Sequence, residues 1–372
     1  MDYDILHQAL SRRRAHETET DAEFAGVLIQ HLATFNLVPD RVDAAGNIYY
    51  QVGESRTLFA AHIDTAHHMG GVNTYKLYKS EKVRFKKNTP TAWAQAAFVK
   101  ADGAALGADD GAGVMLLCWL MQNYVPGHYV FTRGEECGGI GATFIAENCG
   151  DWLRQFDRAI CFDRRDYSDV ITHQGGQRCA SDAFGEALSE ALNEQGLLYM
   201  PSDKGIYTDC KEWIDEVAEC VNISTGYFHE HGPNEWLNLE HLRTLAAAVL
   251  NIAWENLPTV RDPSESSFSM WNKFAKGSES HLGLGISEKR INELYTKELT
   301  VDDYEDVVQL AIDGDDSLLT DLVCSHFGLS VRDAWVLDFS GIKMSEYVTA
   351  ANMRPEAGLK WLYAAATTEI PH

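Results

Sequence analysis

Five short motifs in the sequence carry side chains that can bind metal ions or transfer protons. The first is His62-Ile63-Asp64, which ends a predicted strand. Side chains two residues apart in a strand point the same way, so His62 and Asp64 are expected to face one site. A metal-bound imidazole needs a carboxylate or carbonyl at its second nitrogen, and Asp64 suits that role. Alone, the pair is a weak signal, since chance neighbours give the same spacing.

Adjacent carboxylates form the second and third motifs. Asp109 and Asp110 stand in a Gly-Ala-Asp-Asp-Gly run that leads into an apolar helix, and Glu135 and Glu136 follow a predicted core strand. One aspartate is explained as a helix N-cap, and the glutamates would also suit an exposed acidic loop. Neighbouring carboxylates in a buried place repel each other unless a cation lies between them. We therefore expect a metal ion here, with one glutamate as its ligand and the other as a candidate base.

Asp163 and a late histidine supply the last two motifs. Asp163 ends an apolar strand, where the arginines that follow it would also allow a simple salt-bridged terminus. The histidine is His229 or His231, just before the last predicted helix of the α/β region. Imidazole nitrogen with Asp and Glu oxygen is a zinc-like ligand set that leaves open positions, as a catalytic site requires. His67 and His68, by contrast, are expected on the surface of an insertion.

The order of the five motifs resembles that of the co-catalytic di-zinc exopeptidases. This clan includes the zinc aminopeptidases and the relatives of peptidase T, acetylornithine deacetylase and succinyl-diaminopimelate desuccinylase. Its shared order is His-x-Asp, an aspartate in a Gly-Ala-Asp-Asp type of turn, Glu-Glu, Asp and a late His. The match spans about half of the chain, and its residues are His62, Asp64, Asp109, Glu135, Glu136, Asp163 and His231.

The resemblance implies a metal-dependent hydrolase that cleaves peptide bonds, an aminopeptidase or exopeptidase with two zinc ions. Cobalt or manganese would suit the same ligands. In this scheme Asp109 bridges the two metals. The remaining ligands are His62 and Asp163 for one metal, and Glu136 and His231 for the other.

The same resemblance assigns the catalytic groups. Glu135 would be the general base for a water that bridges the metals, and Asp64 would orient His62. The peptide bond between Asp109 and Asp110 is expected to be cis, as in many relatives. His231 is preferred to His229 because Glu235 follows His231 by four residues, which matches the late His-x-x-x-Glu pattern of the clan.

Two alternative functions stay open. The first is an N-acyl amino acid deacylase or carboxypeptidase with the same two metals. Only 68 positions separate Asp163 from His231, which leaves no room for the lid domain that the deacetylase branch carries there, so the aminopeptidase branch is favoured. The second alternative is an inactive peptidase-fold scaffold or binding protein, which is disfavoured because every ligand position holds a suitable residue type.

The elements that would position these motifs alternate between strands and helices. This alternation predicts an α/β fold, with a mixed, mostly parallel sheet flanked by helices on both faces. The predicted helices are 21–35, 113–123, 140–148, 180–194 and 239–257, and the predicted strands are 47–52, 57–64, 129–132, 159–162, 170–173 and 219–224.

We divide the chain into a di-zinc hydrolase catalytic domain at 1–258 and an acidic, mainly helical C-terminal module at 259–372. An insertion at about 65–106 contains a predicted hairpin, 75–80 with 82–87, and we expect this insertion to shape substrate specificity. The C-terminal part is predicted to hold helices at 287–299, 301–312 and 316–327.

Composition excludes several other classes. The net charge of −24 argues against nucleic acid as a partner, since phosphate would be repelled. No apolar run is long enough to span a membrane, and the N-terminus does not read as a signal peptide, so a cytoplasmic location is expected. The eight cysteines contain no Cys-x-x-Cys pair and are expected to be reduced thiols. The expected partner is a peptide or N-acyl amino acid substrate, and a homo-oligomer is left open.

Overall fold

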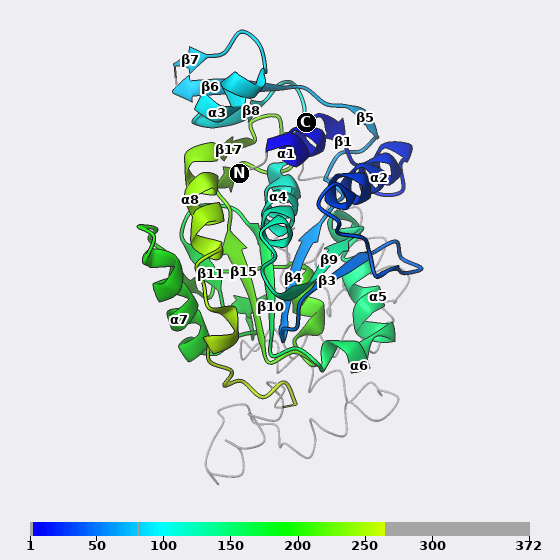
Figure 1. The fold of residues 1–372 in the computed structure, drawn as a ribbon, viewed down its shortest axis with the longest axis vertical. Helices are drawn as coiled ribbons and strands as arrows, with labels where there is room; N and C mark the ends of the chain where they lie inside the picture. Colours follow the sequence, from blue (N-terminus) through cyan, green and yellow to red (C-terminus); the bar gives the residue numbers. More distant parts are fainter. Residues whose placement is uncertain (1–2, 81, 265–372) are drawn as a thin grey trace, which may run out of the picture. The chain divides into compact units, whose positions relative to one another are not determined.

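A mixed sheet of eight strands forms the centre of the protein, in the order β14-β11-β15-β10-β4-β9-β3-β2 (Figure 1). It is seen in a computed structural model that describes residues 3–80 and 82–264. The four central strands run parallel to one another and are β15 (Glu219–Ser224), β10 (Arg158–Arg164), β4 (Thr57–His62) and β9 (Gly127–Thr132). The predicted α/β class with a mixed, mostly parallel sheet is confirmed.

The outer strands of this sheet are mixed in direction. On one side β11 (Asp169–Ile171) runs antiparallel to β15 and parallel to β14 (Met200–Ser202). On the other side β3 (Ile48–Val52) runs antiparallel to both β9 and β2 (Arg41–Val42). Every residue of β4 is buried, as expected for a strand that is covered on both faces. Its side chains alternate between two apolar cores, because Phe59 belongs to one cluster and Leu58 to the other.

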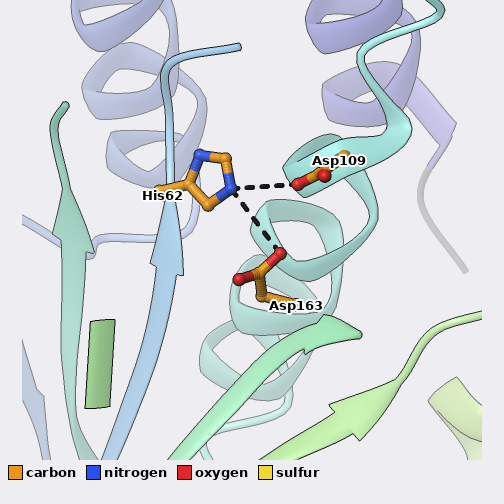
Figure 2. Close-up of side chains that lie close together, drawn as sticks. All are labelled: His62, Asp109 and Asp163. Carbon is orange, nitrogen blue, oxygen red and sulfur yellow. Dashed lines mark hydrogen bonds and ion pairs between the residues drawn. The ribbon is translucent and has the colours of Figure 1, made fainter. Parts of the chain in front are cut away.

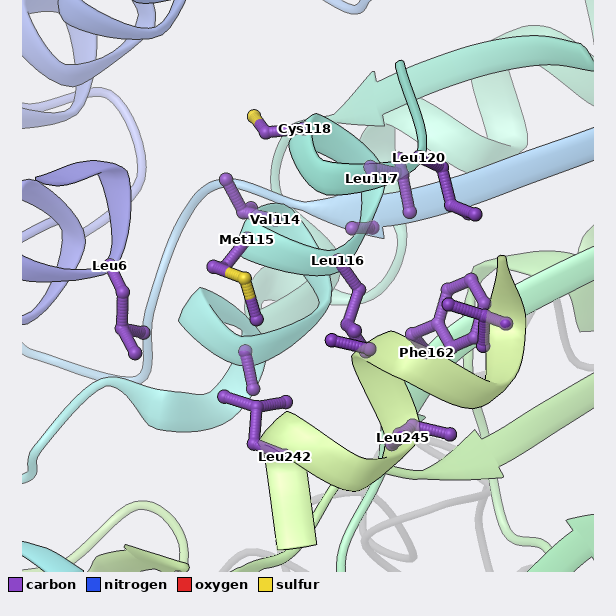
Figure 3. Packing of buried hydrophobic residues seen from close by; sticks show 14 of the residues in the cluster. Leu6, Val114, Met115, Leu116, Leu117, Cys118, Leu120, Phe162, Leu242 and Leu245 are labelled. Atoms are coloured by element: carbon purple, nitrogen blue, oxygen red, sulfur yellow. The ribbon is translucent and has the colours of Figure 1, made fainter. Parts of the chain in front are cut away.

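The first face of the sheet is covered mainly by α4 (Ala108–Gln122) and α8 (Leu239–Val249), which lie in front of it in Figure 1. α4 packs against β4, β10 and α8, and nearly all of its residues are buried. Figure 3 shows its side chains in one apolar cluster with Phe162 of β10 and Leu242 of α8. Other helices that contribute to this cluster include α1 (Tyr3–Leu10), α2 (Glu19–Ala33) and α7 (Asp182–Asn193).

The second face is covered by α5 (Ile140–Asn148), α6 (Gly150–Leu153) and the 3-10 helix η2 (Asp209–Trp213). The Trp213 side chain is fully buried here, and its Nε1 donates a hydrogen bond to the Ala142 carbonyl over 3.1 Å. The same cluster contains Cys161 and Cys210 as buried free thiols. Helices therefore lie on both faces, as the alternating sequence pattern predicts.

A second sheet of five strands joins the insertion to the segment around the late histidine. Its order is β16-β17-β8-β6-β7, and each neighbouring pair is antiparallel. The strands are β16 (Tyr227–Phe228), β17 (Trp236–Asn238), β8 (Phe98–Ala101), β6 (Tyr75–Ser80) and β7 (Val83–Arg84), with α3 (Pro90–Gln95) preceding β8. The predicted hairpin is present as β6 and β7. The pairing of β8 with β17 was not predicted.

Two short antiparallel pairings and two 3-10 helices complete the described elements. β1 (Arg12–Arg13) pairs with β5 (Gly71–Val72), and β12 (His173–Gln174) pairs with β13 (Gln177–Arg178). Two further 3-10 helices are η1 (Glu135–Cys137) and η3 (Trp254–Asn256).

Some predicted bounds differ from the structure. β4 ends at His62 and not at residue 64, because the chain turns there and Asp64 accepts hydrogen bonds from backbone N–H groups at Gly134 and Glu136. The last helix ends at Val249 and not at residue 257, and the Asn251 side chain hydrogen-bonds the Ala247 carbonyl in its last turn. α1 was not predicted, although its apolar side chains are buried against α4.

The predicted helices 287–299, 301–312 and 316–327 lie outside the described residues, as does nearly all of the proposed module 259–372. The division into these two domains stays a prediction. Within the described residues, no helix has the length and apolar character needed to cross a membrane.

Candidate metal centre

The candidate site residues lie at the carboxyl ends of the parallel strands, where open α/β sheets place their ligands. His62 is the last residue of β4, and Asp163 lies near the end of β10. Asp109 is in the first turn of α4, and Glu135 begins η1 directly after β9. His231 lies in the connection between β16 and β17.

Figure 2 shows His62, Asp109 and Asp163 converging on one point. The His62 Nε2 atom lies 3.0 Å from Asp109 Oδ1 and 3.6 Å from Asp163 Oδ1. These three residues form a group that could hold a metal ion. All three side chains are buried, and that of His62 is only 1% exposed.

A second group forms around the other oxygen of Asp109. The His231 Nε2 atom lies 3.0 Å from Asp109 Oδ2 and 3.2 Å from Glu136 Oε1. Asp109, Glu136 and His231 are likewise a group that could hold a metal ion. The two oxygens of Asp109 therefore face two different histidines. The His231 side chain is 52% exposed, so this group is the one open to solvent.

The residues present fit metal ions. Ligand atoms bound to tetrahedral zinc at 2.0–2.2 Å lie about 3.3 Å from one another. The nitrogen-to-oxygen distances of 3.0 to 3.6 Å around His62 and His231 are close to this separation. The donor set of imidazole nitrogen and carboxylate oxygen also suits zinc.

The electrostatics of the site support the same conclusion. Burial raises the pKa values of Glu136 and Asp163, and the charge of Asp109 raises both further. Burial also holds the pKa of Glu135 well above its ordinary value, with Asp163 and Asp209 adding to the shift. So many crowded carboxylates are unfavourable without added positive charge, which divalent cations would supply.

The pKa values of the two histidines are raised as well, which for an imidazole favours the charged form. Hydrogen bonding to Asp109 and Glu136 raises the pKa of His231 to about 11. Burial lowers the pKa of His62, but its contacts with Asp109, Asp163 and Asp64 outweigh burial and hold the pKa well above the ordinary value. Both imidazoles thus lie where a positive charge is strongly favoured.

Asp64 is fully buried between the His62 and Glu136 segments. Its Oδ1 atom lies 3.6 Å from His62 Nδ1, which is longer than a hydrogen bond, and it accepts the Gly134 N–H over 2.7 Å. Its Oδ2 atom accepts the Glu136 N–H over 3.2 Å. Asp64 therefore holds the Glu-Glu segment as well as facing His62, a contact that the strand argument did not predict.

The sequence left open which of Asp109 and Asp110 caps the helix and which faces the candidate metal site. Asp110 Oδ1 accepts the Gly113 N–H over 2.9 Å, so this aspartate acts as the cap of the helical turn. Asp109 instead faces the two histidines. The peptide bond between them is cis, as the resemblance implied.

The salt-bridged alternative for Asp163 is wrong. Arg164 pairs with Asp169, and Arg165 pairs with Glu230, each over 3.0 Å. Asp163 is held instead by polar side chains of neighbouring segments. Thr208 Oγ1 donates to its Oδ2 over 2.8 Å, and Tyr227 Oη donates to its Oδ1 over 3.2 Å.

The other histidines considered from the sequence, His67, His68 and His229, belong to neither group. His67 is half-buried, with its ring nitrogens 2.8 Å from Thr65 Oγ1 and 3.1 Å from the Ala105 carbonyl, while His68 is exposed. His67 is thus only partly exposed, and its contacts join the two ends of the insertion. His229 belongs to neither group of metal-binding side chains in the described residues.

Three buried residues beside the site were left out of the set of site residues chosen from the sequence. Asp209 accepts a hydrogen bond from Thr132 Oγ1, and burial raises its pKa to about 7. Glu235 and Arg14 contact the backbone around Asp109. Glu235 was noted only as a spacing mark. No local pattern singles out Arg14, since it is one of three consecutive arginines.

Comparison with known proteins gives likeness at the level of structure only. No protein-family model matches the sequence, and no curated protein matches it. The chain is similar to the aminopeptidase PepT from Bacillus cereus, with a TM-score of 0.49 and 14% identity over 68% of this chain and 96% of that one.

Two further solved structures are similar to a comparable degree. An aminopeptidase from the archaeon Desulfurococcus kamchatkensis has a TM-score of 0.48 and 14% identity, over 75% of this chain and 98% of that one. A tripeptidase from Staphylococcus aureus has a TM-score of 0.47 and 15% identity, over 66% of this chain and 95% of that one.

Proposed function

We propose that the protein is a metal-dependent hydrolase of peptide bonds, an aminopeptidase or other exopeptidase that holds two metal ions. One observation carries this proposal: the two oxygens of Asp109 face His62 and His231, each within a separate group of metal-binding side chains. A carboxylate in this position can bridge two cations. The buried carboxylates crowded around Asp109 repel one another, which supports the presence of two cations.

The proposed ligands follow from the two groups. His62 and Asp163 would hold one metal, Glu136 and His231 the other, and Asp109 both. Zinc is the preferred ion, and cobalt or manganese suits the same donors. When bound, two such ions activate a water molecule and polarise the carbonyl of the scissile bond.

Glu135 is the proposed general base. It belongs to neither ligand group, although it immediately precedes Glu136. Burial and the neighbouring Asp163 and Asp209 raise its pKa, so its carboxylate has a strong tendency to take up a proton. Glu135 would accept the proton of the attacking water and return it to the leaving amine. Asp64 would support this step by fixing the backbone N–H groups of the Glu-Glu segment.

The proposal is tested by metal content together with a panel of aminoacyl, N-acyl and C-terminal peptide substrates. We expect about two zinc ions per chain and hydrolysis of the aminoacyl substrates. The Glu135→Ala variant should keep its metals and lose activity by about 100-fold or more. Glu147→Ala, at an exposed position of α5, is the matched control and should be unchanged.

Other results of this experiment would favour one of the two alternative functions. Cleavage of only the N-acyl or C-terminal substrates would keep the site and make the protein a deacylase or carboxypeptidase. Absence of both metal and activity would support the inactive scaffold. The division into residues 1–258 and 259–372, the cytoplasmic location and a homo-oligomer also stay proposals.

A further inference from the structure

The backbone turn that carries Asp109 decides where both groups of metal-binding side chains lie. This turn, residues 106–110, is referred to here as the Asp109 turn. It leads into α4, and Gly107 has a φ of 73° in it. A Cβ atom at Gly107 would lie 3.1 Å from Thr65 Cγ2, so the turn is also closely packed against the segment after β4. Any shift of this turn would move Asp109 relative to both His62 and His231.

Glu235 fixes the turn from the side of the His231 segment. Its side chain is buried, and its two oxygens accept four consecutive backbone N–H groups. Oε2 accepts those of Leu106 and Gly107 over 2.8 and 3.1 Å, and Oε1 accepts those of Ala108 and Asp109 over 2.7 and 3.2 Å. Successive N–H groups that converge in this way form an anion-binding concavity. One carboxylate thereby satisfies the free N–H groups at the start of α4.

Arg14 fixes the turn from the side of the His62 segment. Its side chain is 0% exposed, and its Nη2 donates to the Gly107 carbonyl over 3.2 Å. Its Nε donates to the carbonyl of Ile63, the residue between His62 and Asp64, over 2.7 Å. The guanidinium thus joins the Asp109 turn to the motif that holds His62.

The surroundings of Arg14 keep it in this position. Its Nη1 donates to the Ala9 carbonyl at the end of α1 over 2.5 Å, and its guanidinium lies over the Phe24 ring, 4.8 Å from the centroid. Its backbone N–H donates to Thr65 Oγ1 over 3.1 Å. The carboxylates that act on its charge include Asp64 and Asp110. A buried cation therefore lies close to carboxylates that neighbour the proposed ligands His62 and Asp109 in the chain.

We propose that Arg14 and Glu235 are positioning residues that hold the Asp109 turn between the His62 and His231 segments, and so set the spacing of the two metal positions. This inference rests on the proposed function. Both residues contact backbone atoms of the turn and not the ligand atoms of the metal-binding side chains. They would act on the metals only through Asp109 and His62.

Two conservative variants test the proposal. Arg14→Lys keeps the positive charge but cannot reproduce the planar fork that reaches three carbonyls. Glu235→Gln keeps the size of the side chain, but its amide nitrogen cannot accept backbone N–H groups. In each variant we expect zinc affinity to fall by about 10- to 100-fold, as for loss of residues that support metal ligands. We expect kcat to fall with it and KM to change by less than about twofold, because neither side chain is placed to touch substrate.

The chain offers matched controls at the opposite end of the sheet. Arg158 is also a buried arginine, and its Nη atoms donate to Thr57 Oγ1 and to the Leu257 carbonyl, each over 3.2 Å. Glu219 is also a buried glutamate, and it accepts the backbone N–H groups of Ser181 and Val260, each over 2.7 Å. Arg158→Lys and Glu219→Gln should lower thermal stability while zinc affinity and kcat stay within about twofold of the wild-type values.

The measurement is calorimetric titration of the metal-free full chain with zinc, followed by steady-state kinetics. Weakened zinc binding in Arg14→Lys and Glu235→Gln, with wild-type binding in both controls, supports the proposal. Wild-type zinc affinity and kcat in Glu235→Gln would overturn it, and this variant decides alone if Arg14→Lys does not fold. Equal loss of zinc affinity in the controls would overturn it too, because the effect would then be general destabilisation. A wild-type chain that binds no zinc would reject the proposed function itself and this inference with it.

Discussion

The two ends of the central sheet handle buried charge in different ways. At the amino end, Arg158 and Glu219 lie side by side on β10 and β15, and both side chains form hydrogen bonds within the protein. At the carboxyl end, Asp64, Asp109 and Asp163 crowd around His62. Arg14 is the buried arginine that faces this end in the described part of the chain. We infer from this difference that the amino end contributes to stability, while the carboxyl end would be completed by the proposed metal ions.

The largest effect is expected from Asp109→Asn, which removes the shared charge from the carboxyl end. Because Asp109 lies between both ligand groups, zinc binding should fall below two ions per chain. Activity should drop by more than about 100-fold, exceeding the loss expected for a supporting residue. Metal analysis after gel filtration and kinetics with an aminoacyl substrate measure both. Asp182→Asn, an exposed position paired with Arg178, is the control. Two zinc ions and full activity in Asp109→Asn would contradict the assignment.

Removal of metal is expected to destabilise the carboxyl end next most strongly. A metal that binds only the folded state stabilises it by about 2.7 kcal/mol per site when its free concentration is 100 times its Kd. Chelation should therefore lower the free energy of unfolding, and added zinc should restore it. Urea unfolding with and without zinc measures the change. An identical zinc effect in Asp109→Asn would show that the ion binds elsewhere.

Glu219→Gln tests the amino end alone. The carboxylate is buried and also accepts the Ser181 hydroxyl and the Arg261 N–H, so the amide would leave several donors unsatisfied. We expect the free energy of unfolding to fall by about 3 kcal/mol, since buried donors lose a charged acceptor. Urea unfolding of the zinc-loaded protein measures this loss. A loss of bound zinc in this variant would break the distinction between the two ends.

A smaller effect is expected from acid at His241, only ten positions after His231. Burial lowers the pKa of His241 to about 4, whereas carboxylate partners raise that of His231 to about 11. The unfolded state therefore binds the His241 proton first as pH falls from about 6.5 towards 4, and stability is lost in that window. Between pH 6.5 and 5 the loss is about 2 kcal/mol, at 1.36 kcal/mol for each pH unit.

The control for this effect is His241→Gln in the metal-free protein. The variant should lose less stability between pH 6.5 and 5 than the wild type, with thermal unfolding as the measurement. An equal loss in both proteins would assign the acid sensitivity to other groups, such as His67, whose pKa burial also lowers to about 4.

Local pattern was sufficient for six of the eight strands of the central sheet and for the residues that converge at their ends. Runs rich in apolar residues, such as β4 and β15, predict buried strands. Residue types that can bind metals follow one another along the chain in the order of the clan. His62 and Asp163 could therefore be expected near each other, since parallel strands end at one edge. The candidate ligands converge as the motif order implied, while their binding of metal stays a prediction.

Tertiary contacts explain what the sequence could not predict. Arg14 donates hydrogen bonds to the carbonyl groups of Ile63 and Gly107, which are far away in the sequence. The residues next to Arg14 in the chain give no sign of these contacts. The four backbone N–H groups that donate to Glu235 also cannot be predicted from a sequence motif. α1 is only eight residues long, and its position depends on packing against α4 rather than on its own periodicity.

The pairing of β8 with β17 has a consequence for how this protein can change over evolution. Lys100 of the insertion pairs with Trp236, and the Ala101 N–H donates to the carbonyl of Glu235 over 2.9 Å. The loop expected to choose the substrate is thus bonded to the residue that accepts the N–H groups of the Asp109 turn. The insertion therefore cannot be exchanged independently of the segment that carries His231 and Glu235. A change of specificity through the insertion would require matching changes in that segment.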